Sequence, residues 1–278
     1  MAQGSAKTNW DNRVAFAKHI GGNKKSLSAF GWVGGKSQLS AYLLEMFPEH
    51  QKYIEVFGGG LNLLWSKNRS KLEVVNDFDS ELVNLYKAIK LHPQSLSREL
   101  ETMWHSRELF AAYKNGMARA IKNDIQRAAI TYYVIATSFA GKRQHFGRSL
   151  NAAKITTTKL YRDFRVWSER LKTVQIENQD FEKLIRDYDS EDAFFYLDPP
   201  YYGCEDYYQD GEGFGRADHE RLAASLKGTK GKWLLSYNDT PQIRELYREY
   251  EIHTTPEINY TLSKSKPTKV REIVIKNY

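Results

Sequence analysis

The feature that most constrains the fold is an apolar and aromatic run that two prolines bring to an end. The run Ala193-Phe194-Phe195-Tyr196-Leu197 carries no charge and is typical of a strand buried within a parallel sheet. Because prolines cannot continue the hydrogen-bond ladder, Pro199 and Pro200 predict that the strand ends there in a rigid turn. Asp198 therefore falls at the carboxyl end of the strand, which is where open α/β sheets bind their ligands.

The residues of this turn suit the chemistry of an exocyclic amino group on a nucleobase. Such a nitrogen is a poor nucleophile because its lone pair is delocalised into the ring. The Asp198 carboxylate and the Pro199 carbonyl offer two acceptors for its two N–H bonds. Tyr201 offers a ring for stacking, a contact worth roughly 1–3 kcal/mol in single-strand systems. Taken alone, the same residues also fit a proline-rich turn with a solvated aspartate, so Asp198, Pro199, Pro200 and Tyr201 are candidate catalytic residues.

Two earlier segments show a similar pattern of a strand followed by a turn. A short strand at 53–57 leads into three consecutive glycines, Gly58 to Gly60, and a second strand at 72–76 leads into Asp77. Asp77 follows Gly58 at close to the ~20-residue offset at which an acid reaches ribose hydroxyls in dinucleotide-type folds. A helix N-cap is the alternative role for Asp77. The sequence therefore predicts a nucleoside-binding edge next to the Asp198 turn.

The remaining chain alternates strands with helices, except in its middle third. Strands are expected at 173–177, 193–197 and 232–236, and helices at 180–187, 217–227 and 241–248. Residues 91–172 lack strand signals and contain helical patterns at 123–139 and 160–171. The chain is expected to end in two antiparallel strands, at about 250–260 and 269–277. We therefore predict an α/β fold with a Rossmann-like sheet covered by helices on both faces, and a mainly helical insert.

Composition and charge narrow the classes of function. The excess of Lys and Arg gives a net charge of +7, which is compatible with a polyanionic partner. Cys204 is the only cysteine, which excludes an internal disulfide and a multi-cysteine zinc site. No apolar stretch approaches the ~18 residues of a membrane span, and the first residues lack a signal-peptide core. We expect a cytoplasmic protein that uses no metal. Phe30 stands where a P-loop before Gly35 needs glycine, which excludes that motif.

The motifs in their order resemble the Dam-type DNA adenine-N6 methyltransferases, the α group of the amino-methyltransferases. The resemblance covers residues 30–278, and the helical insert between the glycine and catalytic motifs is typical of the α group. The segments that carry it are Phe30-Gly31-Trp32-Val33-Gly34-Gly35-Lys36, Tyr53-Ile54-Glu55-Val56-Phe57-Gly58-Gly59-Gly60, Val75-Asn76-Asp77-Phe78-Asp79, Asp198-Pro199-Pro200-Tyr201, Leu235-Ser236-Tyr237-Asn238-Asp239-Thr240 and Arg271-Glu272-Ile273-Val274-Ile275-Lys276-Asn277-Tyr278. Residues 138–143 lie where we would look for the family's GATC-reading loop but do not match it, so the resemblance implies no target sequence.

The resemblance implies a Rossmann-like methyltransferase fold and methyl transfer from S-adenosylmethionine to the N6 amino group of a flipped adenine in double-stranded DNA. It divides the chain into an arm (1–29), a catalytic domain (30–90 and 173–278) and an inserted target-recognition domain (91–172). The donor contacts it implies are Trp32, Gly34, Gly35, Lys36, Glu55, Phe57, Gly58, Gly60, Asp77, Phe78 and Asp198. Basic loops supply the expected DNA contacts, which are Lys142, Arg143, His145, Arg148, Lys264, Lys266 and Lys269.

Several alternatives remain open at this stage. Trp32 also fits a core or hinge aromatic, and Lys36 an exposed lysine in the first turn of a helix. The basic clusters also fit solvated loops. The same fold could act on cytosine N4 or on RNA, although Asp198 favours adenine within the resemblance. A DNA-binding regulator without turnover is the alternative from a different class. We expect a monomer of bacterial or phage origin, either paired with a restriction enzyme or acting alone.

Overall fold

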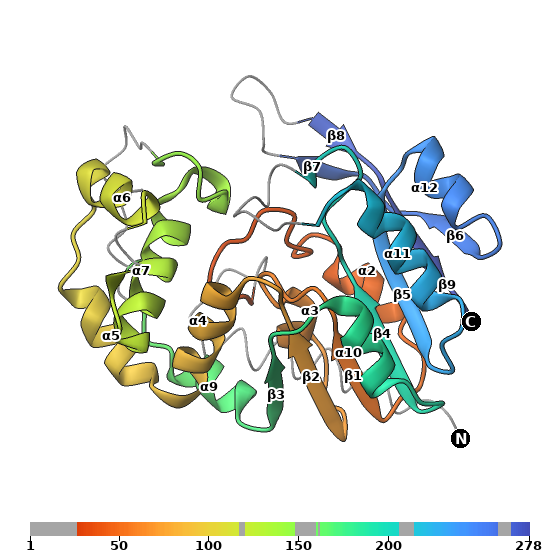
Figure 1. The fold of residues 1–278 in the computed structure, drawn as a ribbon, viewed down its shortest axis with the longest axis horizontal. Helices are drawn as coiled ribbons and strands as arrows, with labels where there is room; N and C mark the ends of the chain where they lie inside the picture. Colours follow the sequence, from red (N-terminus) through yellow and green to blue (C-terminus); the bar gives the residue numbers. More distant parts are fainter. Residues whose placement is uncertain (1–26, 117–119, 148–159, 161, 206–213, 261–267) are drawn as a thin grey trace.

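A seven-stranded sheet forms the centre of the computed structural model, which describes residues 27–116, 120–147, 160, 162–205, 214–260 and 268–278 (Figure 1). The strands β3, β2, β1, β4 and β5 run parallel, and β9 lies antiparallel to both β5 and β6. In sheet order they are β3 (Val174–Glu177), β2 (Leu72–Asn76), β1 (Lys52–Glu55), β4 (Ala193–Leu197), β5 (Lys232–Asn238), β9 (Glu272–Lys276) and β6 (Glu251–Thr254). The order reverses between β1 and β4, which makes their carboxyl ends the switch point of the sheet.

Helices cover both faces because side chains of successive strand residues point in opposite directions. In β4, Phe195 and Leu197 pack into one hydrophobic cluster, and Phe194 and Tyr196 pack into the other. The first cluster is covered by α10 (Phe181–Tyr188), α11 (Arg216–Leu226) and α12 (Pro241–Leu246). The second is covered by α2 (Ser40–Glu45), α3 (Asn62–Ser66), α4 (Ser80–Leu91) and the helices of the insert. The predicted α/β fold class is confirmed.

The insert between α4 and β3 is helical. It contains α5 (Pro93–Glu101), α6 (Arg107–Lys114), α7 (Asp124–Thr137), the short 3-10 helix η2 (Phe139–Gly141) and α9 (Arg165–Leu171). The Asn123 side chain caps α7 by accepting hydrogen bonds from the N–H groups of Ile125 and Gln126. The hydrophobic cluster on this face is continuous from β1 and β4 into α5, α7 and α9. The division of the chain into separate catalytic and recognition domains therefore stays a prediction.

The ends of several elements differ from the prediction. Each of the two expected terminal strands is interrupted, so that β7 (Ile258–Tyr260) and β8 (Thr268–Val270) form a separate two-stranded sheet. The first interruption comes at Thr255, which bonds Glu272 through its N–H and its hydroxyl oxygen, and is followed by Pro256. The helix expected at 160–171 is interrupted, because Leu160 is helical and buried as the pattern predicts, residues 162–164 are not helical, and α9 begins at Arg165.

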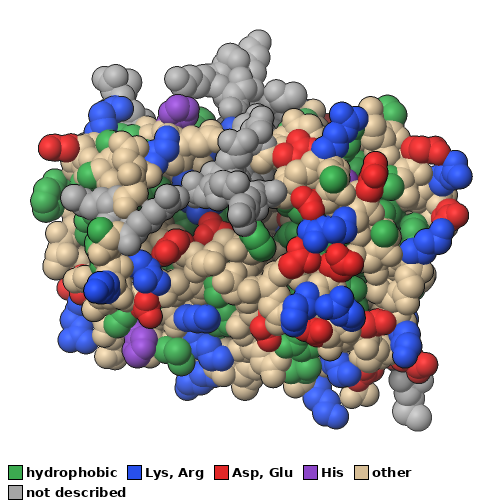
Figure 2. Space-filling model, in the orientation of Figure 1, with side chains coloured by type: hydrophobic (Ala, Val, Ile, Leu, Met, Phe, Trp, Pro, Cys, Tyr) green, Lys and Arg blue, Asp and Glu red, His purple; other side chains and the backbone are tan. Residues whose placement is uncertain are grey.

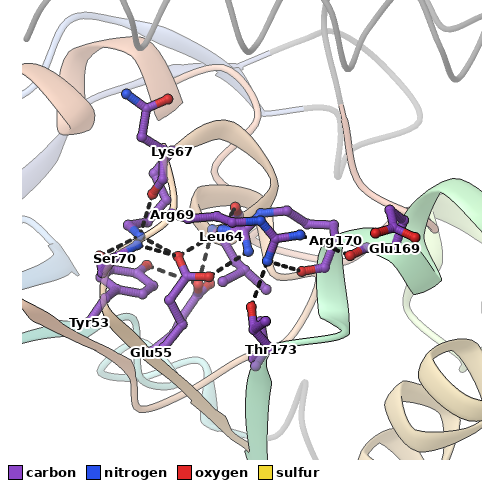
Figure 3. A network of polar contacts seen from close by, with 12 residues as sticks. Tyr53, Glu55, Leu64, Lys67, Arg69, Ser70, Glu169, Arg170 and Thr173 are labelled. Atoms are coloured by element: carbon purple, nitrogen blue, oxygen red, sulfur yellow. Dashed lines mark hydrogen bonds and ion pairs between the residues drawn. The ribbon is translucent and has the colours of Figure 1, made fainter.

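A buried ion-pair network joins the insert to the sheet and to α3 (Figure 3). Glu73 on β2 accepts hydrogen bonds from Lys67 Nζ at 2.6 Å and from both terminal nitrogens of Arg170 at 2.5 and 2.8 Å. Burial acts to raise the pKa of Glu73, but Arg170 and Lys67 lower it overall. Arg170 Nη2 also donates to the Leu64 carbonyl at 3.0 Å, which ties α9 to α3. The position of α3 therefore depends on a charge from the insert.

We expect Arg170→Ala to lower the free energy of unfolding by about 3–5 kcal/mol, because a buried carboxylate loses a bidentate partner. Urea denaturation at neutral pH measures this loss. Arg165→Ala is the matched control, since Arg165 lies on the same helix and pairs with Asp163 in solvent. The control should lose much less stability. Equal losses in the two variants would show that the buried network does not stabilise the fold.

Candidate active site

Three carboxyl groups meet where parallel strands end at the switch point of the sheet. Glu55 is the last residue of β1, Asp77 follows β2 and Asp198 follows β4. All three line one cavity of about 950 Å³. Other predicted donor-site residues that line the same cavity are Trp32, Gly35, Lys36, Phe57, Gly58, Gly60 and Phe78. The structure thus brings together segments from the first and second halves of the chain, as the strand pattern predicts.

Lys36 and Asp198 form a close ion pair in this cavity. Lys36 Nζ donates to both carboxylate oxygens of Asp198 at 2.6 Å and to the Gly34 carbonyl at 2.9 Å. Burial acts to lower the pKa of Lys36, but Asp198 and Glu272 raise it overall, so the lysine keeps its charge. Burial raises the pKa of Asp198 to about 6, although Lys36 opposes the shift. The alternative of an exposed lysine is wrong, because only 4% of the Lys36 side chain is exposed.

Glu272, at the start of β9, is a site residue that the sequence analysis did not single out. Its side chain is buried, and its Oε2 lies 3.8 Å from Lys36 Nζ. Lys36 therefore stands between two carboxylates, Asp198 and Glu272. The segment 271–278 belongs to the family resemblance but assigns Glu272 no role, and a glutamate at the start of a terminal strand usually faces solvent. Only the antiparallel pairing of β9 with β5 brings Glu272 to the site.

The glycine turn, Trp32 and Asp77 contact one another closely. Gly59 has a φ of +50°, and a Cβ atom there would lie 2.6 Å from Trp32 Nε1, so only glycine fits. The Gly59 N–H donates to Asp77 Oδ2 at 2.9 Å, and the Gly59 carbonyl accepts from the Tyr86 hydroxyl at 2.5 Å. Asp77 therefore orders the turn, while Asp79 is the residue that caps α4. Gly59 was not among the predicted site residues, although it lies within the glycine run.

The Glu55 carboxylate accepts hydrogen bonds from two donors, Tyr53 and Leu64 (Figure 3). Its Oε2 accepts from the Tyr53 hydroxyl at 2.9 Å and from the Leu64 N–H at 3.1 Å. Burial raises the pKa of Glu55 to about 8, and burial also raises the pKa of Asp77 to about 6. Removal from water is the largest cause of both shifts, and nearby acids (Asp198 for Glu55, Asp79 for Asp77) raise the pKa values further. The site therefore favours a ligand that carries positive charge.

Three predicted site residues lie beside the cavity and do not line it. They are Gly34, whose carbonyl accepts from Lys36, Pro199, which is buried, and Tyr201. The Tyr201 ring lies 6.1 Å from the ring of Tyr237, and Lys36 Nζ lies 5.0 Å from its centre. Pro200 does line the cavity. The turn at Asp198 thus places Pro200 on the cavity wall and the Tyr201 ring beside Lys36.

The predicted DNA contacts do not form one basic surface in the described residues. Lys142 and Arg143 line the cavity, and His145 is exposed. Lys269 on β8 is exposed and pairs with Glu257 at 3.3 Å. Arg148, Lys264 and Lys266 lie outside the described residues. On the face shown in Figure 2, basic and acidic side chains are interspersed. The DNA-contact assignments therefore stay predictions.

Comparison with known families agrees with the geometry of this site. The model of the D12 class N6 adenine-specific DNA methyltransferases matches residues 32–260. The chain belongs to this family. The enzyme is therefore an adenine-specific DNA methyltransferase, and the match includes the glycine turn, the acidic loop and the Asp198 turn. The family resemblance and the predicted adenine-specific methylation of DNA are confirmed.

Named relatives extend along most of the methyltransferase. The type II methyltransferase M1.LlaDCHI of Lactococcus lactis subsp. cremoris is 30% identical, over 92% of this chain and 97% of the relative. M.CviBI of Paramecium bursaria Chlorella virus NC1A is 29% identical, over 89% and 98%. The DNA N-6-adenine-methyltransferase of Escherichia phage P1 is 24% identical, over 82% of this chain and 32% of that protein. Within the described part of this chain, no helix is long and apolar enough to span a bilayer.

We expect Glu55→Gln to stabilise the free methyltransferase, by roughly 1–3 kcal/mol at pH 8. The folded state holds a proton on Glu55 that the unfolded chain releases above its ordinary pKa of 4.5. Glu55 therefore lowers the free energy of unfolding by an amount that grows as the pH rises from 4.5 towards about 8. Urea denaturation of both proteins at about pH 5 and about pH 8 measures it. If the difference in unfolding free energy between the two proteins were the same at both pH values, the raised pKa of Glu55 would be contradicted.

Proposed function

We propose that the methyltransferase takes its methyl group from S-adenosylmethionine and delivers it to an adenine flipped out of double-stranded DNA. The cavity at the ends of β1, β2 and β4 binds the donor, and the Asp198 turn receives the base. The observation that supports this most directly is Asp198 at the switch point of the sheet, inside a cavity with two more acids. The family assignment supplies the reaction, and this geometry supports the roles of the residues.

The cavity fits the chemical groups of the proposed donor. The acids Glu55, Asp77 and Asp198 suit a ligand with positive charge on sulfur and on an amino group. Asp77 lies where a carboxylate can accept from ribose hydroxyls. Lys36 is the cation for a ligand carboxylate, and the ring of Phe78, which is 56% exposed, is available for stacking. When bound, S-adenosylmethionine supplies a methyl group made electrophilic by its positively charged sulfur.

In our proposal, Asp198 changes its partner before it acts on the base. In the structure both of its carboxylate oxygens accept from Lys36. Glu272 lies 3.8 Å from Lys36 Nζ and can hold the ammonium group when Asp198 turns towards the adenine amino group. Asp198 and the Pro199 carbonyl then accept the two N–H bonds and aim the nitrogen lone pair at the methyl group. Catalysis comes chiefly from positioning and electrostatics.

The transfer itself is a direct displacement. The adenine nitrogen forms a bond to the methyl carbon as the bond from carbon to sulfur breaks, and the nitrogen loses one proton. Asp198, freed from Lys36, is the carboxylate placed to accept that proton. Tyr201 stacks on the flipped base, which offsets part of the few kcal/mol that unstacking costs. The helical insert contacts the DNA and reads the target. We propose a monomer that acts in the cytoplasm of a bacterium or of a phage-infected cell.

We expect Asp198→Asn to lower methyl incorporation into unmethylated genomic DNA by at least about 100-fold, because it removes the charged acceptor. Labelled S-adenosylmethionine measures the rate, and sequencing that detects modified bases identifies the product and the target site. Asp192→Asn is the matched control, because Asp192 precedes β4 and pairs with Lys52 near the surface. Label on a base other than adenine, or full activity of Asp198→Asn, would refute the proposed roles.

The pH dependence of the rate should show the titration of Asp198. Below about pH 6 the carboxyl is protonated, so kcat/KM should fall with decreasing pH, by up to about tenfold per unit. Unfolding would not explain this fall. The pKa values of Asp198 and Asp77 are raised in the folded state, so these two groups stabilise the fold as the pH drops from 7 to 5. Circular dichroism at each pH provides the control, and a flat profile from pH 8 to 5 would contradict the role of Asp198.

A further inference from the structure

Arg143 is predicted from the sequence to bind DNA phosphates, but its side chain is turned towards the donor cavity. Arg143 Nη1 lies 2.6 Å from Asp79 Oδ2, and the guanidinium carbon lies 5.1 Å from the centre of the Trp32 ring. Only 22% of the side chain is exposed. A guanidinium that stacks on an aromatic ring and pairs with a carboxylate has lost much of its freedom to bind a phosphate.

Both partners of Arg143 belong to the loops that form the donor cavity. Trp32 lines the cavity and lies against Gly59 of the glycine turn. Asp79 donates its N–H to Asp77 Oδ1 at 3.0 Å and caps α4 with its own side chain. Arg143 therefore connects the loop that contains Trp32 to the loop that contains Asp77. It also brings positive charge close to two neighbouring carboxylates.

The loop that carries Arg143 is held against the donor site by its backbone. Gly141 has a φ of +70°, and a Cβ atom there would lie 2.7 Å from the Gly31 carbonyl oxygen. The loop closes on itself, because Phe139 N–H donates to the His145 carbonyl at 2.8 Å and Gly147 N–H donates to the Thr137 carbonyl at 2.7 Å. This loop, residues 138–147, directly follows α7 of the insert. The insert thus forms part of the wall of the donor cavity.

The backbone of Arg143 is itself in an unfavourable conformation. Its φ is +59°, and among the described residues Leu61 is the only other non-glycine residue with a positive φ. This conformation costs an L-residue with a side chain roughly 1–2 kcal/mol. Strain of this kind persists where the surrounding contacts determine the conformation, and it is concentrated at functional sites. Here the contacts that accompany it are those with Asp79 and Trp32.

We propose that Arg143 is a positioning residue of the donor site, through which loop 138–147 couples the binding of the methyl donor to the binding of DNA. The guanidinium holds Trp32 and Asp79 in the arrangement that receives the donor. Duplex DNA that contacts the exposed side of the same loop shifts this arrangement and changes the affinity for the donor. By linkage, the donor changes the affinity for DNA by the same factor. The inference rests on the proposed donor and goes beyond it by joining the two binding sites.

Binding of S-adenosylhomocysteine, the demethylated product of the proposed donor, tests this role without turnover. Its dissociation constant is measured by calorimetry with and without sheared unmethylated genomic DNA. In the absence of DNA, Arg143→Ala should raise the dissociation constant of S-adenosylhomocysteine by roughly tenfold. DNA should then leave the dissociation constant of the variant almost unchanged. Arg143→Lys should restore only part of the product affinity and part of the effect of DNA, because lysine has no planar group to stack on Trp32.

Arg127→Ala is the matched control. Arg127 also ties the insert to α4, through Glu81 at 3.5 Å, but the ion pairs and ring contacts described for it include neither Trp32 nor the loop that holds Asp77. It should keep both the product affinity and the coupling. The inference is overturned if Arg143→Ala binds product like the wild type and instead weakens DNA binding with a smaller salt dependence, as a phosphate contact would. If the wild type binds no product, the proposed donor fails as well, so the two failures are distinguishable.

Discussion

The burial of carboxyl groups at the ends of parallel strands is the constraint on which the rest of the structure depends. Glu55, Asp77 and Asp198 occupy adjacent strand ends because the topology brings those ends to one edge. Burial raises the pKa of each, and Lys36 is the cation in direct contact with Asp198. Ionised carboxylates are therefore unfavourable in this site in the free protein, and a cation and N–H donors that enter the site stabilise them. A positively charged donor and an amino group meet both requirements.

The surrounding structure compensates for that cost. Leu64 in α3 shows how, because its N–H donates to Glu55 while its carbonyl accepts from Arg170. Arg170 in turn is fixed by Glu73, which is buried and fully paired. The buried ion pairs of Glu73 are thus linked through Leu64 to Glu55, an acid with no cation in direct hydrogen-bond contact among the described residues. This arrangement separates the buried ion pairs from the residues proposed to bind the substrates.

Local sequence patterns predict the frame of the site because its contacts follow from strand topology. The bounds of β4 match the prediction because an apolar run ends at prolines, and Asp198 and Asp77 meet because both follow parallel strands. The patterns do not show the partners of a loop residue. Arg143 pairs with the carboxylate of Asp79, 64 positions away. The local sequence around a basic loop residue does not show whether its side chain faces a phosphate or an aspartate. Glu272 reaches Lys36 only through the pairing of β9 with β5, which its own segment does not encode.

The shared wall between the insert and the donor cavity bears on how the enzyme selects its substrate. A loop that only bound phosphates would need neither the positive φ of Arg143 nor the close approach of Gly141 to Gly31. These features place loop 138–147 in close contact with the loop that contains Trp32, as the proposed coupling requires. In the proposed coupling, DNA that displaces the first loop also changes the second. Recognition of the target can in this way alter the site that holds the methyl group, without any contact between the bases and the residues at the strand ends.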